Sequence, residues 1–538
     1  MSKQIKNRFI CHIRDLNENG QGIATHNGKV VFVNSAIPGD IAEVEIIKSS
    51  KKYDVARVIE LQNNNLIRSA AFCPIYKICG GCNTQHLSYA AALNYKRSHV
   101  INCLNRIGGL NFDQNICTPC IGMDLSNKSL SEQSGIYSDF SSITEKNSNN
   151  LNYEHQKLVT AFDQLLNTQD YSVLKKKLNE ESKGLFYRNK VIYAAENKNG
   201  CLSLGFYAPR SHSVCSFPLC SIQASVFDLI KNVICEFCDE YGISAYDESN
   251  ETGCIRKVFL RRSTAEYKLQ LCLSIYENLS KELLLNLADT IDKALTKNCY
   301  DEILESFYIN INRSRGNKVM GDKFILIRGK ERITDSLLGL KFNLSPQAFF
   351  QVNSRQTEIL YKLAIDSLGD ISQKRVLDLY CGTGTITLLM AQKSQTAFGI
   401  ELVPEAISDA KLNAKINSID NVEFICGKAE DELELLISKL GNNFSSPICP
   451  IPSHQRDNYF DIIVLDPPRK GAELSLLDTI LRLKPEKVLY ISCHPASLAR
   501  DLKYLCEEDY ELEKIIPVDM FAFSTHVETV CLMTRKKR

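Results

Sequence analysis

The sequence contains no run of about 18 or more apolar residues, which argues against a transmembrane helix. Residues 1–8 lack the apolar stretch that a secretory signal needs. Charge of neither sign is in excess, since 64 Lys and Arg residues stand against 63 Asp and Glu residues. A content of 44% hydrophobic and 24% charged residues excludes wholesale disorder, a collagen-like repeat and a membrane bundle. We therefore expect a globular cytoplasmic protein with no membrane partner.

Positive charge is concentrated in the first part of this otherwise neutral chain. Residues 1–110 contain 14 Lys or Arg residues and 7 Asp or Glu residues, and none of these acids follows Glu60. The sequence also ends in four basic residues, 535–538. A local excess of positive charge can bind a polyanion. A solvated basic face without a ligand explains the charge equally well.

Residues 8–62 show the pattern of a compact β domain. Runs of alternating apolar and polar residues at 29–33, 41–46 and 55–59 are separated by turn residues. Several short strands within about 55 residues predict a small OB-like barrel of the kind that binds oligonucleotides. A structural β domain without a ligand would have the same pattern. We assign residues 1–62 to this domain.

Two further domains are expected in the rest of this 538-residue chain. Residues 63–340 mix strand and helix patterns, which predicts an α+β domain. Residues 341–538 alternate strands and helices, which predicts an α/β domain with a Rossmann-like parallel sheet. A stretch rich in Ser and Asn, 121–150, indicates a low-order insertion that extends to about residue 183. A second loop-like insertion, 441–459, carries three prolines.

An apolar strand at 376–379 leads into a Gly-x-Gly turn, Gly382-Thr383-Gly384. Glycines let the backbone pass close to a ligand at the carboxyl end of the first strand of a doubly wound sheet. A second strand ends in Glu401, 17 residues after Gly384, where a carboxylate can accept hydrogen bonds from ribose hydroxyls. The turn lacks the third glycine of the dinucleotide pattern. A nucleoside ligand such as S-adenosylmethionine is therefore favoured over a pyrophosphate ligand.

Two more apolar strands deliver polar groups to the same edge of the expected sheet. One strand leads to Asp466, which two prolines follow, and the next leads to Cys493. A single cysteine is more often a small buried hydrophobe than a reactive thiol. Polar groups at three consecutive strand ends are better explained by a shared site than by packing.

Several motifs taken together resemble one known family. They are Phe349-Phe350-Gln351-Val352-Asn353, Asp378-Leu379-Tyr380-Cys381-Gly382-x-Gly384, Asp466-Pro467-Pro468-Arg469-x-Gly471, Ser492-Cys493-x-Pro495 and His526-Val527-Glu528-Thr529-Val530. This set resembles the RNA uracil-5-methyltransferases, over nearly the whole length of the chain. The N-terminal β domain is similar to the TRAM domain that many members carry. Each motif alone is not specific, whereas the set is.

The resemblance implies that Cys493 is the nucleophile and Glu528 the proton acceptor. Carbon 5 of uracil is too weak a nucleophile to take a methyl group from a sulfonium, but a thiolate that adds to carbon 6 makes carbon 5 reactive. The proton on carbon 5 must then leave, which requires a positioned base. We assign no role to His494, because neighbouring residues in a strand point to opposite faces.

The resemblance also implies that Gln351, Tyr380, Glu401 and Asp466 line a pocket for S-adenosylmethionine. Glu401 fits the ribose contact inferred above from the residues themselves. A second role stays open for Asp466, because a carboxylate there could accept the imide proton of uracil and so select uracil over cytosine.

Three cysteines lie close together in Cys73-x5-Cys79-Gly80-Gly81-Cys82. Two glycines allow a tight loop, so the thiols suit a metal cluster, although the spacing is neither that of a zinc finger nor that of a ferredoxin. A fourth thiolate must come from farther along the chain, and Cys215 and Cys220 are candidates. The ribosomal-RNA branch of the family resembles this arrangement, which implies a structural 4Fe-4S cluster held by Cys73, Cys79, Cys82 and Cys220. A structural zinc is the alternative.

Single-stranded or looped RNA is the expected partner, because the target base must leave its stack to reach a buried thiol. Arg188 and Lys190 are candidate RNA contacts, with structural salt bridges as the alternative. Relatives that have both a TRAM-like domain and the cysteine cluster mostly act on 23S ribosomal RNA. We therefore expect a monomer that methylates a specific uridine of 23S ribosomal RNA. Transfer-RNA uracil-5-methylation, RNA cytosine-5-methylation and non-catalytic binding of RNA by an iron–sulfur protein remain alternatives.

Overall fold

The computed structural model describes residues 8–123, 185–316, 318–441 and 459–537. The predicted insertions at 121–150, with its extension to about 183, and at 441–459 lie almost entirely outside these residues. None of the helices in the described part of the chain is both long and apolar enough to cross a membrane.

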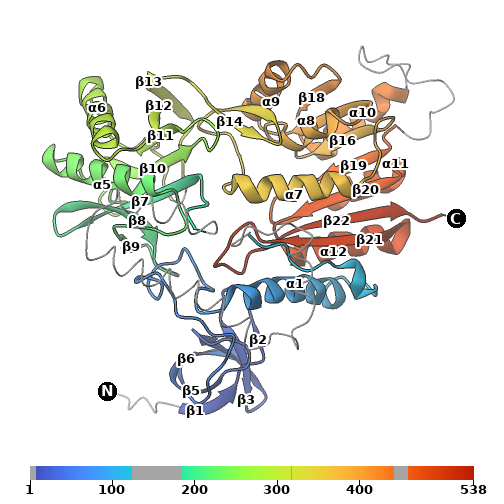
Figure 1. Ribbon diagram of the computed structural model, residues 1–538, viewed down its shortest axis with the longest axis horizontal. Helices are drawn as coiled ribbons and strands as arrows, with labels where there is room; N and C mark the ends of the chain where they lie inside the picture. The colour runs from blue at the N-terminus through green and yellow to red at the C-terminus, as the bar shows by residue number, and fades with distance from the viewer. Residues whose placement is uncertain (1–7, 124–184, 317, 442–458, 538) are drawn as a thin grey trace.

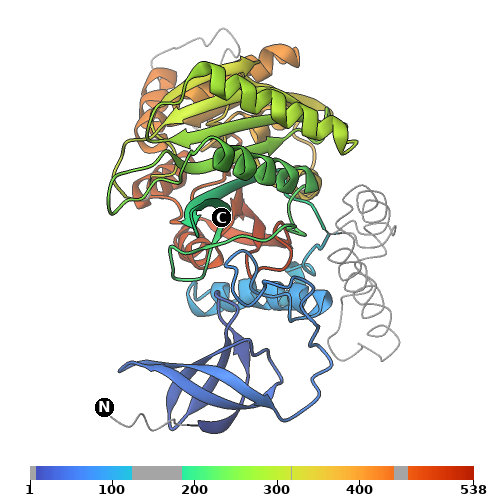
Figure 2. The same cartoon turned by 90° about the vertical axis from the view of Figure 1, so that its left-hand side faces the viewer.

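The N-terminal residues form a curled six-stranded sheet, as the alternating pattern predicts (Figure 1). Its strands are β1 (Arg8–His12), β2 (Asp15–Leu16), β3 (Gly22–His26), β4 (Lys29–Asn34), β5 (Ile41–Ser49) and β6 (Tyr53–Leu61), in the order β1-β5-β6-β4-β3-β2. The sheet curls far enough for β1 to contact β3. Small apolar side chains, including Ala24, Val31 and Ala42, are fully buried inside it. Figure 2 shows this domain at one end of the molecule, beneath the rest of the chain.

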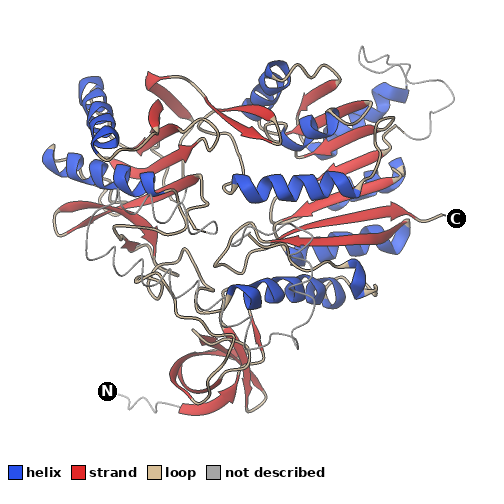
Figure 3. Ribbon diagram, in the orientation of Figure 1, coloured by secondary structure: helices blue, strands red, loops and turns tan. Residues whose placement is uncertain are grey.

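The central residues form a mixed seven-stranded sheet with two helices on one face (Figure 3). The strands are β7 (Lys190–Lys198), β8 (Cys201–Tyr207), β9 (Val214–Cys215), β10 (Ile255–Arg262), β11 (Lys268–Ile275), β12 (Ile303–Ile311) and β13 (Lys323–Gly329), and the helices are α5 (Ser225–Glu240) and α6 (Lys281–Lys297). In α6 the buried residues Leu284, Leu287, Ile291 and Leu295 recur every three or four positions, so one face of the helix packs on the sheet. A hairpin of β14 (Ile333–Leu337) and β15 (Leu340–Leu344) leads to the last domain.

The C-terminal domain has the doubly wound sheet that alternating strands and helices predict. Its strand order is β18-β17-β16-β19-β20-β22-β21, with β16 to β20 parallel and β22 antiparallel to β20. The strands are β16 (Arg375–Leu379), β17 (Thr396–Glu401), β18 (Val422–Cys426), β19 (Ile462–Leu465), β20 (Lys487–Ser492), β21 (Tyr510–Val518) and β22 (Glu528–Arg535). The helices are α7 (Ser354–Ser367), α8 (Thr385–Ala391), α9 (Pro404–Ile416), α10 (Ala429–Gly441), α11 (Leu474–Leu483) and α12 (Pro495–Glu508). Helices α7, α8 and α9 cover one face, and α10, α11 and α12 cover the other.

Helix α1 (Tyr89–Arg106) packs on the C-terminal domain, although it follows the cysteine segment in sequence. It lies against α12 and β21, and Leu93, Val100 and Leu104 join the apolar core on that face of the sheet (Figure 1). In the middle of α1, the buried ammonium of Lys96 pairs with the buried carboxylate of Asp519, and the hydroxyl of Tyr89, the first residue of the helix, donates to the same carboxylate at 2.6 Å. Asp519 directly follows β21, so these contacts join α1 to the end of that strand.

Candidate active site and a cysteine-lined cavity

The candidate residues of the C-terminal domain lie along one edge of its sheet. Glu401 ends β17, Tyr380 follows β16, Asp466 follows β19 and Cys493 follows β20. Because β22 runs antiparallel to β20, its first residue, Glu528, lies at the same edge. The order of the strands in the sheet therefore places the ribose-type acid at one end of the row and the thiol and late glutamate at the other. Motifs spread over more than 120 residues meet in one place, as the sequence predicts.

A cleft opens at the Gly-x-Gly turn. It is lined by Gln351, Tyr380, Gly382, Tyr361 and Asp466, among others. Three of the four predicted pocket residues therefore share one cleft, and Tyr361, whose hydroxyl group hydrogen-bonds with the Gln351 side chain, joins them.

The backbone of the turn explains why glycines stand there. Gly384 has a φ of +79°, and a Cβ at this position would lie 2.8 Å from the ring of Phe424. Gly382 has a φ of +55°, and a Cβ built on it would meet no atom within 4 Å. Gly384 is thus needed for conformation and packing. Gly382 keeps the backbone open towards the cleft.

Glu401 does not line the cleft directly, but its carboxylate holds the turn that does. One carboxylate oxygen accepts from the Gly382 N–H at 3.1 Å, and the other accepts from the Val403 N–H at 2.9 Å. A carboxylate oxygen has more than one lone pair, so these bonds leave capacity for a ligand hydroxyl.

The site contains one thiol, that of Cys493, and two carboxyl groups, those of Asp466 and Glu528. Burial, together with the nearby carboxylates of Glu528 and Asp466, raises the pKa of the Cys493 thiol to about 11. Burial and the charge of Asp466 raise the pKa of Glu528 to about 8. Burial alone raises the pKa of Asp466 to about 7. The three groups lie at the ends of the adjacent strands β19, β20 and β22, and raised pKa values of this kind are typical of catalytic carboxyls and thiols.

Two residues of this site were not singled out from the sequence. The positive charge of Arg469 lowers the pKa of both Cys493 and Glu528, and its guanidinium lies 3.5 Å from the ring of His526. Its place in the Asp-Pro-Pro-Arg segment was a usable signal. Tyr361 lies on α7, where a buried tyrosine at helical spacing looks the same as ordinary core packing, so no sequence signal identified it.

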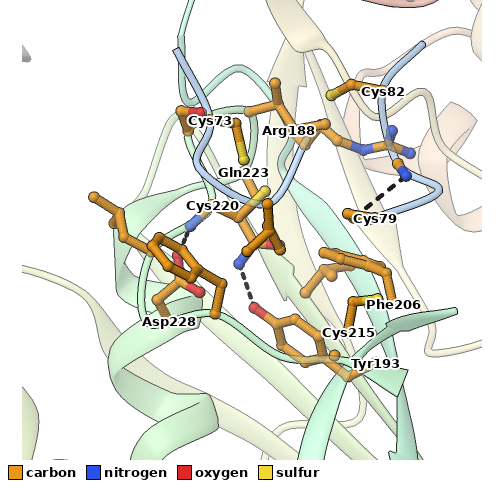
Figure 4. Close-up of a pocket in the computed structure, with 18 of the residues that line it drawn as sticks. Cys73, Cys79, Cys82, Arg188, Tyr193, Phe206, Cys215, Cys220, Gln223 and Asp228 are labelled. Carbon is orange, nitrogen blue, oxygen red and sulfur yellow. Dashed lines mark hydrogen bonds between the residues drawn. The ribbon is translucent and has the colours of Figure 1, made fainter. Parts of the chain in front are cut away.

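A cavity of about 300 Å³ lies between the central sheet and the cysteine segment, which forms part of its wall (Figure 4). It is lined by Cys73, Cys79, Cys82, Cys215 and Cys220. Burial raises the pKa of the Cys82 thiol to about 12, and charges on Cys73 and Cys79 act in the same direction, which shows that these thiols are neighbours. The fold therefore gathers both candidates for the fourth thiol around the three of the segment.

The two candidates differ in their surroundings. The Cys220 thiol interacts with those of Cys82 and Cys73, and its backbone N–H donates to the buried Asp228 at 2.8 Å. The Cys215 thiol is the neighbour of Cys79, and it donates to the carbonyl of Ile78 at 3.2 Å. Among the described residues, no three His, Cys, Asp or Glu side chains are close enough together to hold a single metal ion.

Arg188 and Lys190 lie between the cysteine cavity and the active site. Both line the cavity, and both stand over aromatic rings: Arg188 is 5.9 Å from the ring centre of Phe521, and the Lys190 ammonium is 5.3 Å from that of Phe349. Phe349 is 63% exposed and borders the cleft at the Gly-x-Gly turn. Burial lowers the pKa of Lys190 to about 7.

Comparisons with known proteins bear on the family of this chain. Residues 266–536 match the family model described as tRNA (Uracil-5-)-methyltransferase, and residues 12–59 match the TRAM domain. An RNA methyltransferase of Clostridium tetani is 33% identical over 526 residues, which cover 98% of this chain and 96% of that protein. An RNA methyltransferase of Bacillus cereus is 34% identical over 535 residues, which cover 99% and 98% of the two chains. Both relatives are themselves described as uncharacterized.

One solved structure has a similar fold over the whole chain. It is the tRNA (uracil-54, C5)-methyltransferase of Pyrococcus abyssi in complex with S-adenosyl-L-homocysteine. The TM-score is 0.64 at 22% sequence identity, and the alignment covers 98% of this chain and all of the other. The similarity supports the predicted fold: an N-terminal TRAM domain, a central domain and a C-terminal methyltransferase domain.

Proposed function

This chain belongs to the RNA uracil-5-methyltransferase family, and from that premise we propose that it methylates carbon 5 of a specific uridine in 23S ribosomal RNA, as a cytoplasmic monomer. One observation carries the chemistry: Cys493 follows β20, which lies between the strand that leads to Asp466 and the strand that begins with Glu528, and Asp466 also lines the cleft at the Gly-x-Gly turn. A nucleophile, a base and a nucleoside-type pocket are thus neighbours at one sheet edge.

In this proposal, Cys493 forms a bond from its sulfur to carbon 6 of the flipped uracil. That addition makes carbon 5 nucleophilic. S-adenosylmethionine, held between Gln351, Tyr380, Glu401 and Asp466, supplies the methyl group. Burial and the nearby carboxylates raise the pKa of the thiol to about 11, and the positive charge of Arg469 acts in the opposite direction and favours the thiolate that attacks carbon 6.

Glu528 completes the reaction as the proton acceptor. After methyl transfer, the carboxylate takes the proton from carbon 5, the C5–C6 double bond forms again, and the bond between carbon 6 and sulfur breaks. The pKa of Glu528, about 8, is close to neutral pH. Such a pKa suits a group that must take up a proton and then release it. Asp466 is placed either to hold the cofactor or to accept the imide proton of uracil.

The choice of ribosomal RNA rests on two features that occur together, the TRAM domain and the cysteine-lined cavity. Relatives that combine them mostly act on 23S ribosomal RNA. Transfer RNA is the second candidate, because the similar Pyrococcus abyssi protein is a tRNA (uracil-54, C5)-methyltransferase. Arg188 and Lys190 are proposed RNA contacts in both cases, since Lys190 lies over Phe349 at the cleft and Arg188 lies over Phe521 in the loop before Glu528.

Methyl transfer to defined RNAs tests the proposal. The purified protein is incubated with radiolabelled S-adenosylmethionine and with 23S ribosomal RNA or transfer RNA, each made without modifications, and the methylated nucleoside is identified by mass spectrometry. We expect 5-methyluridine in ribosomal RNA. Label in transfer RNA alone would contradict the ribosomal assignment, and 5-methylcytidine as the product would contradict the assignment of uracil.

We also propose that Cys73, Cys79, Cys82 and Cys220 hold a 4Fe-4S cluster. A zinc ion would need its ligands gathered around one point, whereas a cubic cluster binds each thiolate through a different iron and so holds the thiols farther apart. Five thiols line one cavity of about 300 Å³, and they include the four that a cubic cluster needs. The proposed reaction has no redox step, so the cluster would shape the RNA-binding segment.

Loss of the cluster is expected in specific cysteine variants. Protein purified without oxygen should contain about four irons and about four sulfides per chain and show broad visible absorbance. Cys82→Ser and Cys220→Ser should lose both, whereas Cys235→Ser, in α5 and outside the cavity, should keep them. Zinc in the place of iron would contradict the proposal. If Cys215→Ser lost the iron and the absorbance while Cys220→Ser kept them, Cys215 would be the fourth ligand instead of Cys220.

A further inference from the structure

Three segments that are far apart in sequence meet beside the active site. They are the turn 17–21 between β2 and β3, residues 83–84 just after the third cysteine of the cavity, and the loop 519–527 that leads directly into Glu528. We call this contact the three-segment junction. It joins the N-terminal domain, the cysteine segment and the catalytic end of β22.

Asn83 stands at the centre of the three-segment junction. Its side-chain oxygen accepts from the Thr525 N–H at 3.0 Å, and its side-chain nitrogen donates to the Thr525 hydroxyl at 3.1 Å. The same nitrogen lies 3.5 Å from the Glu18 carbonyl, which also accepts from the Thr525 hydroxyl. One amide side chain thus clamps the loop 519–527 at a residue three positions before Glu528.

The backbone beside Asn83 strengthens this clamp. The N–H groups of Asn83 and Thr84 both donate to the Phe523 carbonyl, at 3.0 and 3.1 Å. Phe523 has a φ of +64°, a left-handed conformation that is rare for a phenylalanine and that the surrounding bonds must hold. The turn 17–21 approaches from the other side so closely that a Cβ at Gly20 would lie 2.4 Å from the Asn83 carbonyl oxygen.

The start of the loop is anchored separately. Asp519, which is fully buried, pairs with Lys96 and accepts from Tyr89, both on α1. The loop 519–527 is therefore held by α1 at its beginning, by Asn353 and Tyr187 at the carbonyls of Met520 and Ala522, and by Asn83 near its end. Glu528, at 4% exposure, comes next as the first residue of β22, where it pairs with Val518 of β21, and the end of the loop that Asn83 holds leads directly into it.

We propose that Asn83 is a positioning residue for the step in which Glu528 removes the proton from carbon 5. This inference rests on the proposed function and adds a role for the cysteine segment, which would act on the second half of the reaction by holding the loop that carries the base. Sulfur bonds to carbon 6 and the methyl group moves to carbon 5 as before. If the carboxylate is displaced, the proton stays on carbon 5, the carbon–sulfur bond cannot break, and the enzyme remains attached to its methylated RNA.

The test is a comparison of Asn83→Ala with wild type in single and multiple turnovers. We expect the first turnover to place methyl on RNA at close to the wild-type rate, while the steady-state rate falls about tenfold and the covalent adduct on a denaturing gel rises several-fold. Asn63→Ala is the matched control, because Asn63 also bridges two loops, through the Gly39 carbonyl and the Ile41 N–H, but within the N-terminal domain. The inference would be overturned if Asn83→Ala lowered the first-turnover rate and the steady-state rate equally without forming adduct. It would also be overturned if Asn63→Ala accumulated the same adduct.

Changes at Thr525 keep the test decisive if Asn83→Ala folds poorly. Thr525→Val removes the hydroxyl at almost constant shape and should accumulate adduct, whereas Thr525→Ser should behave as wild type. Because the two side chains bond to each other, Asn83→Ala combined with Thr525→Val should be no worse than the more severe single variant. Failure of Glu528→Gln to form adduct would count against the proposed function itself; adduct with Glu528→Gln but not with the Asn83 and Thr525 variants would count against this inference alone.

Discussion

Cys493→Ala is expected to lower methyl transfer by at least about 10⁴-fold, with RNA binding and S-adenosylmethionine binding unchanged. Alanine retains the backbone at the end of β20 but has no sulfur to add to carbon 6, so carbon 5 never becomes a nucleophile. The thiol is half-buried, so its removal costs little packing. Methyl transfer is measured with labelled S-adenosylmethionine, and RNA binding is measured by gel shift on the same preparation.

Cys506→Ala provides the matched control for this variant. Cys506 is another half-buried cysteine of the same domain, on α12, but it lies away from the sheet edge that carries the site. It should retain wild-type activity. Methylation that survives in the Cys493 variant, or that is lost equally in the Cys506 variant, would contradict a specific role for the Cys493 sulfur.

The strand-end residues of the C-terminal domain could be predicted because their positions follow from local patterns. An apolar run followed by Asp466 or Cys493 indicates a parallel strand, and parallel strands place their carboxyl ends at one edge. Glu528 is different, since it begins a strand. Its place at the same edge depends on β22 running antiparallel, which no local pattern encodes. There the family resemblance supplied what periodicity could not.

Contacts between segments that are far apart in the chain could not be predicted from the sequence. Asn83 and Thr525 are separated by 442 positions, and nothing in either segment indicates that they pair. In the same way, α1 has an apolar face that would fit many partners, and only the fold shows that it packs against α12 and β21. The fourth cysteine is a related case, because both Cys215 and Cys220 line the cavity and spacing alone does not separate them.

The three-segment junction changes how the N-terminal domain relates to the chemistry. A TRAM domain tethered only by a linker could capture RNA without affecting the active site. Here the turn 17–21 contacts the loop before Glu528, and the Glu18 carboxylate lies 3.8 Å from the ring of His494, next to the thiol. The N-terminal domain therefore contacts the segments that carry the proposed catalytic residues.

Glu528→Gln is expected to accumulate a covalent protein–RNA adduct while turnover falls by about 10² to 10⁴-fold. Glutamine has nearly the same shape as glutamate but cannot accept a proton, so methyl transfer proceeds and elimination of the thiol stops. The adduct should appear as a band of lower mobility on a denaturing gel, and it should carry label from both RNA and S-adenosylmethionine. Glu511→Gln, on the exposed side of the neighbouring strand β21, should form no such band.

The same variant should be more stable than wild type near neutral pH, which separates loss of the base from loss of the fold. Glu528 has a pKa of about 8 in the folded protein against an ordinary value of 4.5. Between these values the folded chain binds a proton that the unfolded chain has lost, so wild-type stability falls as pH rises through this window, by up to about 1.4 kcal/mol per pH unit. Glutamine does not titrate, so the variant should gain up to about 3 kcal/mol at pH 7 and almost nothing at pH 4.5. Urea unfolding at several pH values measures the difference, and a variant that is less stable at pH 7 would contradict the raised pKa of Glu528.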